Sequence, residues 1–327
     1  MSSPRPLQEP THHRRPKRDL LVLLGLMALF VIGFIGLAAS IGWEETWAQL
    51  RMLSPVQFFG LLALSMINYT LRGLRWHIFS QRLGLPLELR QNILHFMGGF
   101  AMTVTPGRIG ELVRLRWISR LTGWTFERIL PLPFVDRAFD VAAMGIVLAC
   151  GVVLSQTGTV GAIPVAILAM GTALIVTRPK LILAIVHGLW KLIGRWPRRF
   201  VGLRKAARSM AVFSAPTVAL PALALSIIGW SAEGYALYLL LTWMGADISL
   251  AAATVIFIFS TLAGGLTGAP GGVGGAEAAM LMLLSAQSIP LETALPAMAV
   301  IRITTLWFAI FVGLIAFPIA EKLSKKV

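Results

Sequence analysis

Charged residues are scarce in this chain of 327 residues, at 13%, and acidic ones are the scarcest, with 14 Asp and Glu against 29 Lys and Arg. A soluble domain usually carries about twice that charged fraction. The chain also has 57% hydrophobic residues and a mean hydropathy of +0.78. These values exclude an ordinary soluble domain and predict a polytopic membrane protein.

Cysteine is nearly absent, because Cys150 is the single one and lies in an apolar run. One cysteine excludes an internal disulfide and a cysteine-based metal site, so we predict no metal and no cofactor. Nucleic acid is not expected as a partner either. The Lys and Arg residues are concentrated in short loops between apolar runs, as in cytoplasmic loops that face anionic lipid.

Apolar runs divide the chain into candidate membrane spans, each of which needs roughly 20 residues. Six runs qualify: 20–41, 56–77, 134–154, 160–177, 217–241 and 291–317. A signal peptide is the alternative for the first run, but its apolar core would usually be about 7 to 15 residues, so we interpret it as a transmembrane helix.

The remaining segments are polar or basic. Residues 1–18 contain four prolines and predict a disordered cytoplasmic tail, and 322–327 form a short C-terminal tail. The integral membrane domain is predicted to cover 19–321. The basic segment 178–210 is interpreted as an amphipathic helix on the inner leaflet.

Two other segments, 92–119 and 250–285, break in the middle of apolar sequence. The breaks are formed by Pro106, Gly107 and Gly110 in the first segment and by Pro270, Gly271, Gly272 and Gly274 in the second. Irregular backbone at membrane depth is tolerated where protein or a water-filled cavity satisfies its polar groups. We therefore expect two re-entrant helical hairpins around one shared cavity.

The loops assigned to the outside carry few basic residues. They contain Glu44, Glu45, Asp247 and Glu292 against Arg51 alone. This asymmetry places both termini in the cytoplasm and makes the hairpins enter from opposite sides. The predicted fold is an all-α polytopic membrane protein of six transmembrane helices plus two hairpins. Repeat A covers about 56–154 and repeat B about 217–317, as an inverted repeat.

Charged side chains at bilayer depth cost on the order of 3 kcal/mol, so they need a partner or a function. They fall into two groups: Arg108, Glu111, Arg114, Asp136, Arg137 and Asp140 on the inner side, and Glu233, Glu277 and Arg302 on the outer side. Asp136 and Asp140 share a helix face and repel each other unless a cation such as Arg108 lies between them.

Structural explanations stay open for several of these residues. Arg114 and Arg116 could extend to lipid headgroups, and Arg72 and Arg75, at the end of a span, are expected to do so. Arg302 with two carboxylates could be a structural ion pair that fixes helix packing. Asn68 begins a glycosylation sequon but lies inside a span, which argues against its use.

The two Pro-Gly segments, the acidic block from Asp136 to Asp140, and Arg302 together resemble the lysylphosphatidylglycerol synthase transmembrane-region family. Members fused to a soluble aminoacyl-transferase domain make and flip an aminoacylated lipid, and stand-alone members are thought to move lipids or lipid-linked intermediates. A chain that ends at Val327 is expected to lack the soluble domain. The resemblance therefore implies a flippase rather than a synthase.

We predict that an anionic or zwitterionic headgroup, or a lipid-linked carrier, enters the cavity in the cytoplasmic membrane. Arg108 and Arg302 would contact phosphate, and the carboxylates would balance them or bind a cationic headgroup or protons. No catalytic residue is assigned. A membrane-embedded transferase with an Asp or Glu base, and a scaffold for envelope-lipid enzymes, remain the alternatives. A homo-oligomer is possible on this interpretation.

Overall fold

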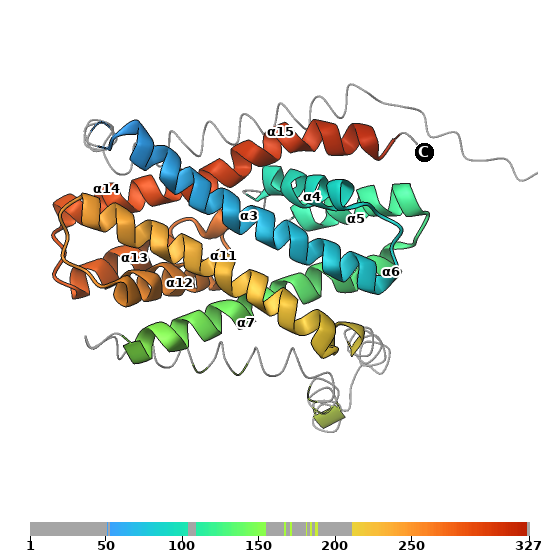
Figure 1. Ribbon diagram of the computed structural model, residues 1–327, viewed down its shortest axis with the longest axis horizontal. Helices are drawn as coiled ribbons and strands as arrows, with labels where there is room; N and C mark the ends of the chain where they lie inside the picture. The colour runs from blue at the N-terminus through green and yellow to red at the C-terminus, as the bar shows by residue number, and fades with distance from the viewer. Residues whose placement is uncertain are drawn as a thin grey trace, which may run out of the picture.

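The computed structural model describes residues 53–103, 109–154 and 211–325, together with isolated residues 51, 167, 171, 181, 184, 187 and 188. All regular elements in these ranges are helical, as predicted. The α-helices are α3 (Pro55–Leu83), α4 (Leu89–Gly98), α5 (Ile109–Thr122), α6 (Phe126–Ile129), α7 (Pro131–Leu154), α11 (Pro216–Trp243), α12 (Leu250–Leu266), α13 (Gly275–Ala286), α14 (Leu291–Arg302) and α15 (Phe308–Leu323) (Figure 1).

Three helical stretches in the described ranges are long and apolar enough to cross a membrane: Phe126–Leu154, Pro216–Trp243 and Leu291–Leu323. They contain the predicted spans 134–154, 217–241 and 291–317. The predicted span 56–77 falls within α3, whose 29 residues extend about 43 Å at 1.5 Å per residue. The predicted spans 20–41 and 160–177 lie outside the described residues, as does the basic segment 178–210 apart from isolated positions.

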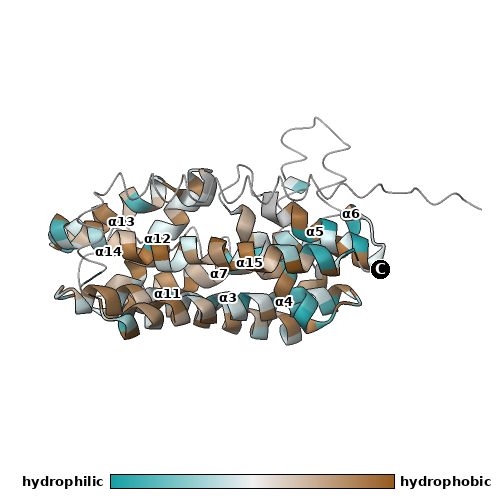
Figure 2. Ribbon diagram, turned by 90° about the horizontal axis from the view of Figure 1, so that it is seen from above, coloured by the Kyte–Doolittle hydropathy of each residue, from teal (hydrophilic) through white to brown (hydrophobic). Residues whose placement is uncertain are grey.

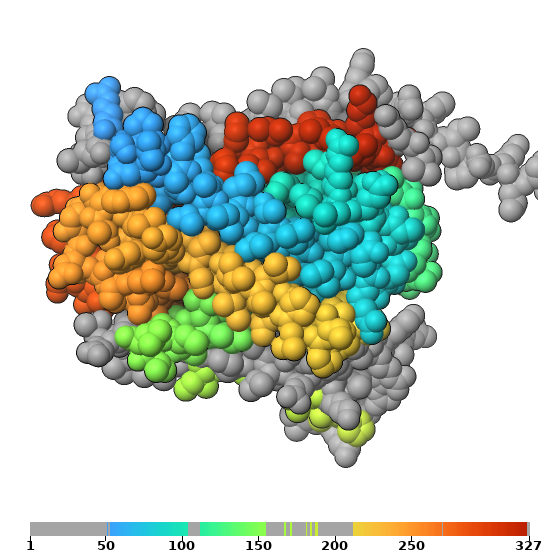
Figure 3. Space-filling model, viewed as in Figure 1, coloured from blue at the N-terminus to red at the C-terminus, as the bar shows by residue number. Residues whose placement is uncertain are grey.

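Helices α3 and α11 pack along each other and form one face of the molecule (Figure 3). Local sequence sets the ends of α3. Ser54 accepts a hydrogen bond from the Gln57 N–H, Pro55 occupies the first helical position, and Gly84 ends the helix with a φ of 84°. Helix α7 packs on α11 and on α3, so these three long helices form the frame around the interior.

Each predicted hairpin is a helix, a break and a second helix. In the first, α4 continues into a 3₁₀ turn, η1 (Gly99–Met102), before α5; in the second, α12 is followed by a short turn, η4 (Pro270–Gly272), and α13. Both views place α4 and α5 at one end of the molecule and α12 and α13 at the other (Figures 1 and 2). The hairpins therefore approach the interior from opposite ends.

The described residues include only part of the first break. Pro106, Gly107 and Arg108 lie outside them, while Gly110 and Glu111 belong to the first turn of α5. The second break is described throughout. Gly271, Gly272 and Gly274 have φ values of 63°, 68° and 87°, a left-handed conformation that residues with a Cβ rarely adopt. Glycine therefore lets this chain reverse within a few residues.

The last long helical stretch extends further than predicted, to Leu323, and contains one π-helical turn, η5 (Ile303–Trp307), between α14 and α15. Its α15 part packs against α4 and η1. The contact is closest at Gly313, where an added Cβ would lie 2.7 Å from the Phe100 carbonyl carbon and would also collide with the Ala101 backbone nitrogen. Gly313 thus lets α15 support the first hairpin.

This contact gives a stability prediction. Gly313→Ala should lower the free energy of unfolding by about 1–3 kcal/mol, because the new methyl group would push α15 away from backbone that cannot rotate aside. The measurement is the thermal unfolding midpoint in detergent. Gly60→Ala is the matched control, since that glycine is also inside a helix and a Cβ there would meet nothing within 4 Å. Equal midpoints for the two variants would contradict the prediction.

Candidate functional site

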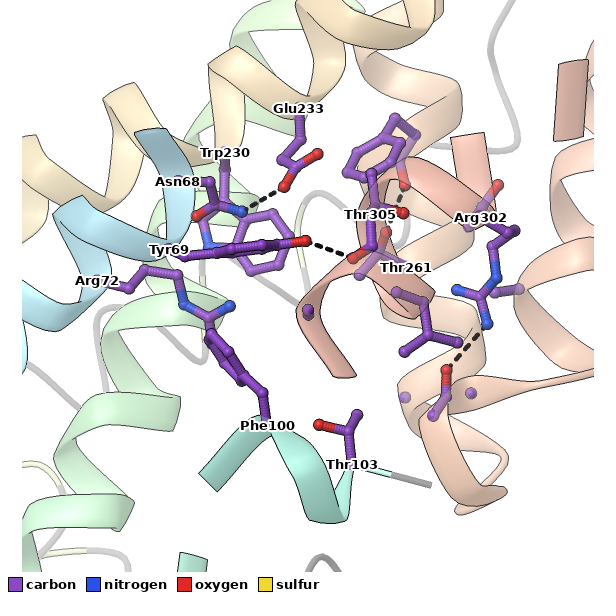
Figure 4. A pocket seen from close by; sticks show the side chains of 18 of the residues that line it. Asn68, Tyr69, Arg72, Phe100, Thr103, Trp230, Glu233, Thr261, Arg302 and Thr305 are labelled. Atoms are coloured by element: carbon purple, nitrogen blue, oxygen red, sulfur yellow. Dashed lines mark hydrogen bonds between the residues drawn. The ribbon is translucent and has the colours of Figure 1, made fainter. Parts of the chain in front are cut away.

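A cavity of about 480 Å³ lies between the two helical hairpins (Figure 4). Gly99, Phe100 and Thr103 line it from the first hairpin, and Gly271 and Gly272 line it from the second. Side chains of α3, α5, α7, α11, α12 and α13 and the segment from Arg302 to Ala309 complete the wall. Both hairpins thus line one cavity, and its volume suits a ligand of drug-like size.

The charged side chains that line this cavity are mostly arginines. Among the described residues they are Arg72, Arg114, Arg137 and Arg302, together with the acidic Glu233. Planar guanidinium groups hold phosphate or carboxylate through paired N–H donors. The wall is therefore suited to an anionic group, and α3, α5, α7 and α14 each supply one of these arginines.

Beneath this wall, two aspartates of α7 pair with arginines of α3 and of α7 itself. Asp140 lies 2.8 Å from both Arg72 Nη2 and Arg75 Nη1, and Asp136 also pairs with Arg75. Arg137 lies 3.3 Å from each aspartate. Arg75 is fully buried, so its charge depends on these two carboxylates for compensation.

Neutral donors and acceptors complete the same cluster. Trp230 Nε1 donates to Asp140 at 3.3 Å, and Arg75 donates to Ser226 Oγ at 2.6 Å. Both partners belong to α11. The cluster therefore joins α3, α7 and α11 through polar contacts, in addition to their apolar packing.

One sequence-based prediction about this region is wrong. Arg72 and Arg75 pair with Asp136 and Asp140 and do not extend to lipid headgroups. Arg108, the cation suggested for this place, lies outside the described residues. Position at the end of an apolar run favoured the headgroup interpretation. The structure overrides it because α3 packs directly beside α7, so two buried carboxylates face arginines spaced three residues apart.

Arg114 lies inside the molecule instead of extending outward. Its side chain is almost fully buried, and its guanidinium carbon lies 4.2 Å from the centroid of the Phe96 ring and 5.5 Å from that of Trp76. A Cβ at Gly99 would collide with the Arg114 guanidinium. The missing side chain at Gly99 thus makes room for a cation over an aromatic cluster at the first hairpin.

Arg302 occupies an equivalent position at the second hairpin. Its Nε lies 2.6 Å from Glu277 Oε1, and its Nη2 donates to the Gly271 carbonyl oxygen at 3.0 Å. Glu277 in turn accepts from the Gly274 N–H at 2.7 Å. The predicted pairing of Arg302 with Glu277 is therefore confirmed, and the pair fixes the glycine-rich break against α14.

The predicted pairing of Arg302 with Glu233 is wrong. Glu233 lies on a different wall of the cavity and accepts hydrogen bonds from Asn68 Nδ2 at 2.9 Å and Ser65 Oγ at 3.1 Å (Figure 4). The reason is the position of α11, which packs Glu233 against α3 and away from α14. The sequence indicates that the two residues lie at a similar depth in the membrane, but it does not show on which side of the cavity each of them lies.

Sequence reasoning missed several cavity residues. Asn68 and Tyr69 line the cavity, and the Tyr69 hydroxyl donates to the Thr305 carbonyl oxygen in the π-helical turn. Trp230 also lines it (Figure 4). A usable signal was present, since Ser65, Asn68 and Arg72 recur at helical spacing and mark a polar face on an apolar helix.

Among the described residues, no group of three His, Cys, Asp or Glu side chains could hold a metal ion. Cys150 is exposed on α7 and lies outside the cavity lining. The polar groups that line the cavity are arginine, carboxylate, amide and hydroxyl side chains, which can form hydrogen bonds and ion pairs.

Comparison with known proteins identifies relatives along nearly the whole chain. One is a UPF0104 membrane protein of Methanothermobacter thermautotrophicus, 25% identical over 331 residues that cover 91% of this chain and 98% of the relative. Another is the inner membrane protein YbhN of Escherichia coli, 24% identical over 325 residues that cover 96% of this chain and 95% of the relative.

A second UPF0104 membrane protein of Methanothermobacter thermautotrophicus is 27% identical over 310 residues, which cover 88% of this chain and 91% of the relative. The sequence profile of the lysylphosphatidylglycerol synthase TM region matches residues 20–313. This match includes both hairpins, the buried arginine–aspartate cluster and Arg302. The chain therefore belongs to the lysylphosphatidylglycerol synthase TM region family of integral membrane proteins.

Proposed function

We propose that this protein is a lipid flippase, which moves a phospholipid or a lipid-linked isoprenoid intermediate across the cytoplasmic membrane. The headgroup would enter the cavity between the hairpins while the hydrocarbon chains stay in the bilayer. The observation that carries the proposal is the arginine-lined cavity formed where two broken helices meet. Broken helices around a central polar site are a recurring construction in membrane transporters.

Arginines at two places in the cavity wall would bind the phosphate. Arg72 and Arg137 line the cavity on one wall and Arg302 lines it at the second hairpin. Each of them also pairs with a carboxylate, which keeps the guanidinium in place without using all five of its N–H donors. A phosphate could therefore be passed between two arginine groups, at the first and second hairpin.

The distribution of charge supports a cytoplasmic position for the end that carries α5 and α6. Hydrophilic residues gather at this end, where the described chain also finishes (Figure 2). Exposed basic residues here are Arg82, Arg90, Arg116, Arg128 and Lys322, against the exposed acids Glu88 and Glu127, whereas the opposite end carries the exposed Asp247 and Glu292 against Arg51. Lys and Arg are concentrated in cytoplasmic loops, so we propose that both termini lie in the cytoplasm.

The hairpins divide the membrane domain into two related halves. We propose that repeat A, with α3 to α7, opens its hairpin toward the cytoplasm, and that repeat B, with α11 to α15, opens its hairpin toward the outside. In such inverted repeats, alternating access arises when one half rocks against the other around a fixed site. The hairpins would then be re-entrant.

The first prediction concerns lipid movement. The protein would be reconstituted into liposomes with fluorescent lipids that differ in headgroup, and transbilayer movement would be measured. Arg302→Gln should slow movement by roughly 10- to 100-fold, because a hydrogen bond to a charged group contributes about 1.5–3 kcal/mol.

The matched control for this assay is Arg90→Gln, because Arg90 is exposed on α4 and does not line the cavity. It should leave the rate near that of the unchanged protein. Thermal unfolding of each variant would confirm that it is folded. Normal lipid movement in a folded Arg302→Gln variant would contradict the assigned role of Arg302, and absence of movement for every headgroup would contradict the flippase proposal.

The second prediction concerns topology. In a Cys150→Ala background, a cysteine in place of Asp247 should react with an impermeant thiol reagent from outside the cell, and a cysteine in place of Arg128 should react only in inverted vesicles. Both residues are exposed, Arg128 on α6 and Asp247 in the loop between α11 and α12, and these elements lie at opposite ends of the molecule (Figure 1). Labelling of both positions from the same side would refute the proposed orientation.

A further inference from the structure

Glu233 is a buried carboxylate on the cavity wall. Only 2% of the residue is exposed, and it lies in the middle of α11 beside Trp230 (Figure 4). Its two oxygens accept hydrogen bonds from Ser65 and Asn68, which are neutral. Each carboxylate oxygen has a second lone-pair site, so a further hydrogen can be accommodated on the side that faces the cavity.

Glu233 has no ion-pair partner within the described residues, in contrast to Asp136, Asp140 and Glu277. An ionised carboxylate that is buried without a cation is costly, and taking up a proton removes this cost. Neutral hydrogen-bond partners are compatible with both forms, because a hydroxyl group can donate or accept.

The charged and titratable groups around the same cavity come from several neighbouring elements. They are Arg72 and Tyr69 on α3, Arg114 on α5, Arg137 and Asp140 on α7, and Arg302 with Glu277 at the second hairpin. Arg72 lies one helical turn from Asn68, and its Nη2 is engaged by Asp140. Arg72, Arg137 and Arg302 are thus paired with other carboxylates, and Glu233 is the acidic residue of the described cavity lining that has no such pair.

We propose that Glu233 binds a proton whenever an anionic headgroup occupies the cavity, so that one proton is carried with each lipid. This inference rests on the proposed lipid transport. The step is a simple acid–base exchange: a proton from water forms an O–H bond with one Glu233 oxygen and is released to water when the headgroup leaves.

Coupling follows from electrostatics and thermodynamic linkage. A phosphate in the same water-poor cavity repels the ionised Glu233 carboxylate, so phosphate binding favours the protonated form. By reciprocity, protonation of Glu233 strengthens phosphate binding by the same factor. The empty cavity with ionised Glu233 and the loaded cavity with neutral Glu233 are then the two favoured states.

The test uses the full chain in phosphatidylcholine vesicles that contain a small fraction of fluorescent phosphatidylglycerol, an anionic probe. A pH difference is imposed, and the ratio of labelled lipid between the two leaflets is measured at steady state. With one proton per lipid, each pH unit should produce up to roughly tenfold accumulation in the leaflet on the alkaline side. Glu233→Gln should abolish this accumulation and leave a ratio near one.

Glutamine keeps the size of the side chain and its carbonyl acceptor, so Glu233→Gln preserves contact with Ser65 and Asn68. Glu292→Gln is the matched control, since Glu292 is exposed on α14 and outside the cavity, and it should accumulate lipid like the unchanged protein.

Each outcome of the leaflet-ratio experiment either supports or contradicts proton coupling through Glu233. Movement of the probe with a leaflet ratio near one at every pH difference would overturn proton coupling and leave the flippase proposal intact. Proton coupling would also be overturned by accumulation that responds to a sodium gradient but not to a pH gradient, by accumulation that folded Glu233→Gln retains, or by a complete lack of movement of the anionic probe. Failure of every headgroup in the separate liposome assay would overturn both proposals.

Discussion

The exclusion of water from the space between α3, α7 and α11 is the constraint on which this structure depends. Arg75 is fully buried, and Asp136 and Asp140 are nearly so. Such charges are tolerated only when they compensate one another with good geometry. Arg72, Arg75 and Arg137 meet the two aspartates, which fixes the depth and rotation of α3 relative to α7. The cavity wall is built on this fixed arrangement.

The hairpins satisfy a different requirement, which is the hydrogen bonding of irregular backbone. At the second hairpin, Arg302 and Glu277 bind the carbonyl of Gly271 and the N–H of Gly274, so the turn is held by charged side chains. At the first, Arg114 packs over aromatic rings behind Gly99. Each hairpin therefore has an arginine beside it, the buried Arg114 at the first and the half-buried Arg302 at the second, and both line the cavity.

The cavity therefore contains two kinds of charged group: arginines that are paired with carboxylates, and the carboxylate of Glu233, which is not paired with a cation in the described part of the chain. Arginines held by carboxylates offer spare N–H donors to an anion without leaving an uncompensated charge in the empty site. On the proposed mechanism Glu233, which accepts hydrogen bonds from the neutral Ser65 and Asn68, would take up a proton when an anion binds. Such a site would both attract a phosphate and adjust its own charge, as the movement of a polar headgroup through an apolar bilayer requires. The family membership is consistent with that use.

The sequence by itself determined the membrane class, the all-helical fold, the apolar helical stretches at 134–154, 217–241 and 291–317 and the glycine-rich break between α12 and α13. These depend on hydropathy, on proline and on glycine, which act locally along the chain. It also gave the pairing of Arg302 with Glu277, because charges at membrane depth require partners and few are available.

Only the tertiary structure decided which charges meet across helices. Arg72 and Arg75 were expected at headgroups, yet they pair with Asp140 and Asp136, and Glu233 pairs with Asn68 instead of Arg302. Depth in the membrane can be read from sequence, since hydropathy follows the helix axis. The direction in which a side chain points around that axis depends on which helices pack together, and that is a property of contacts between residues far apart in the chain.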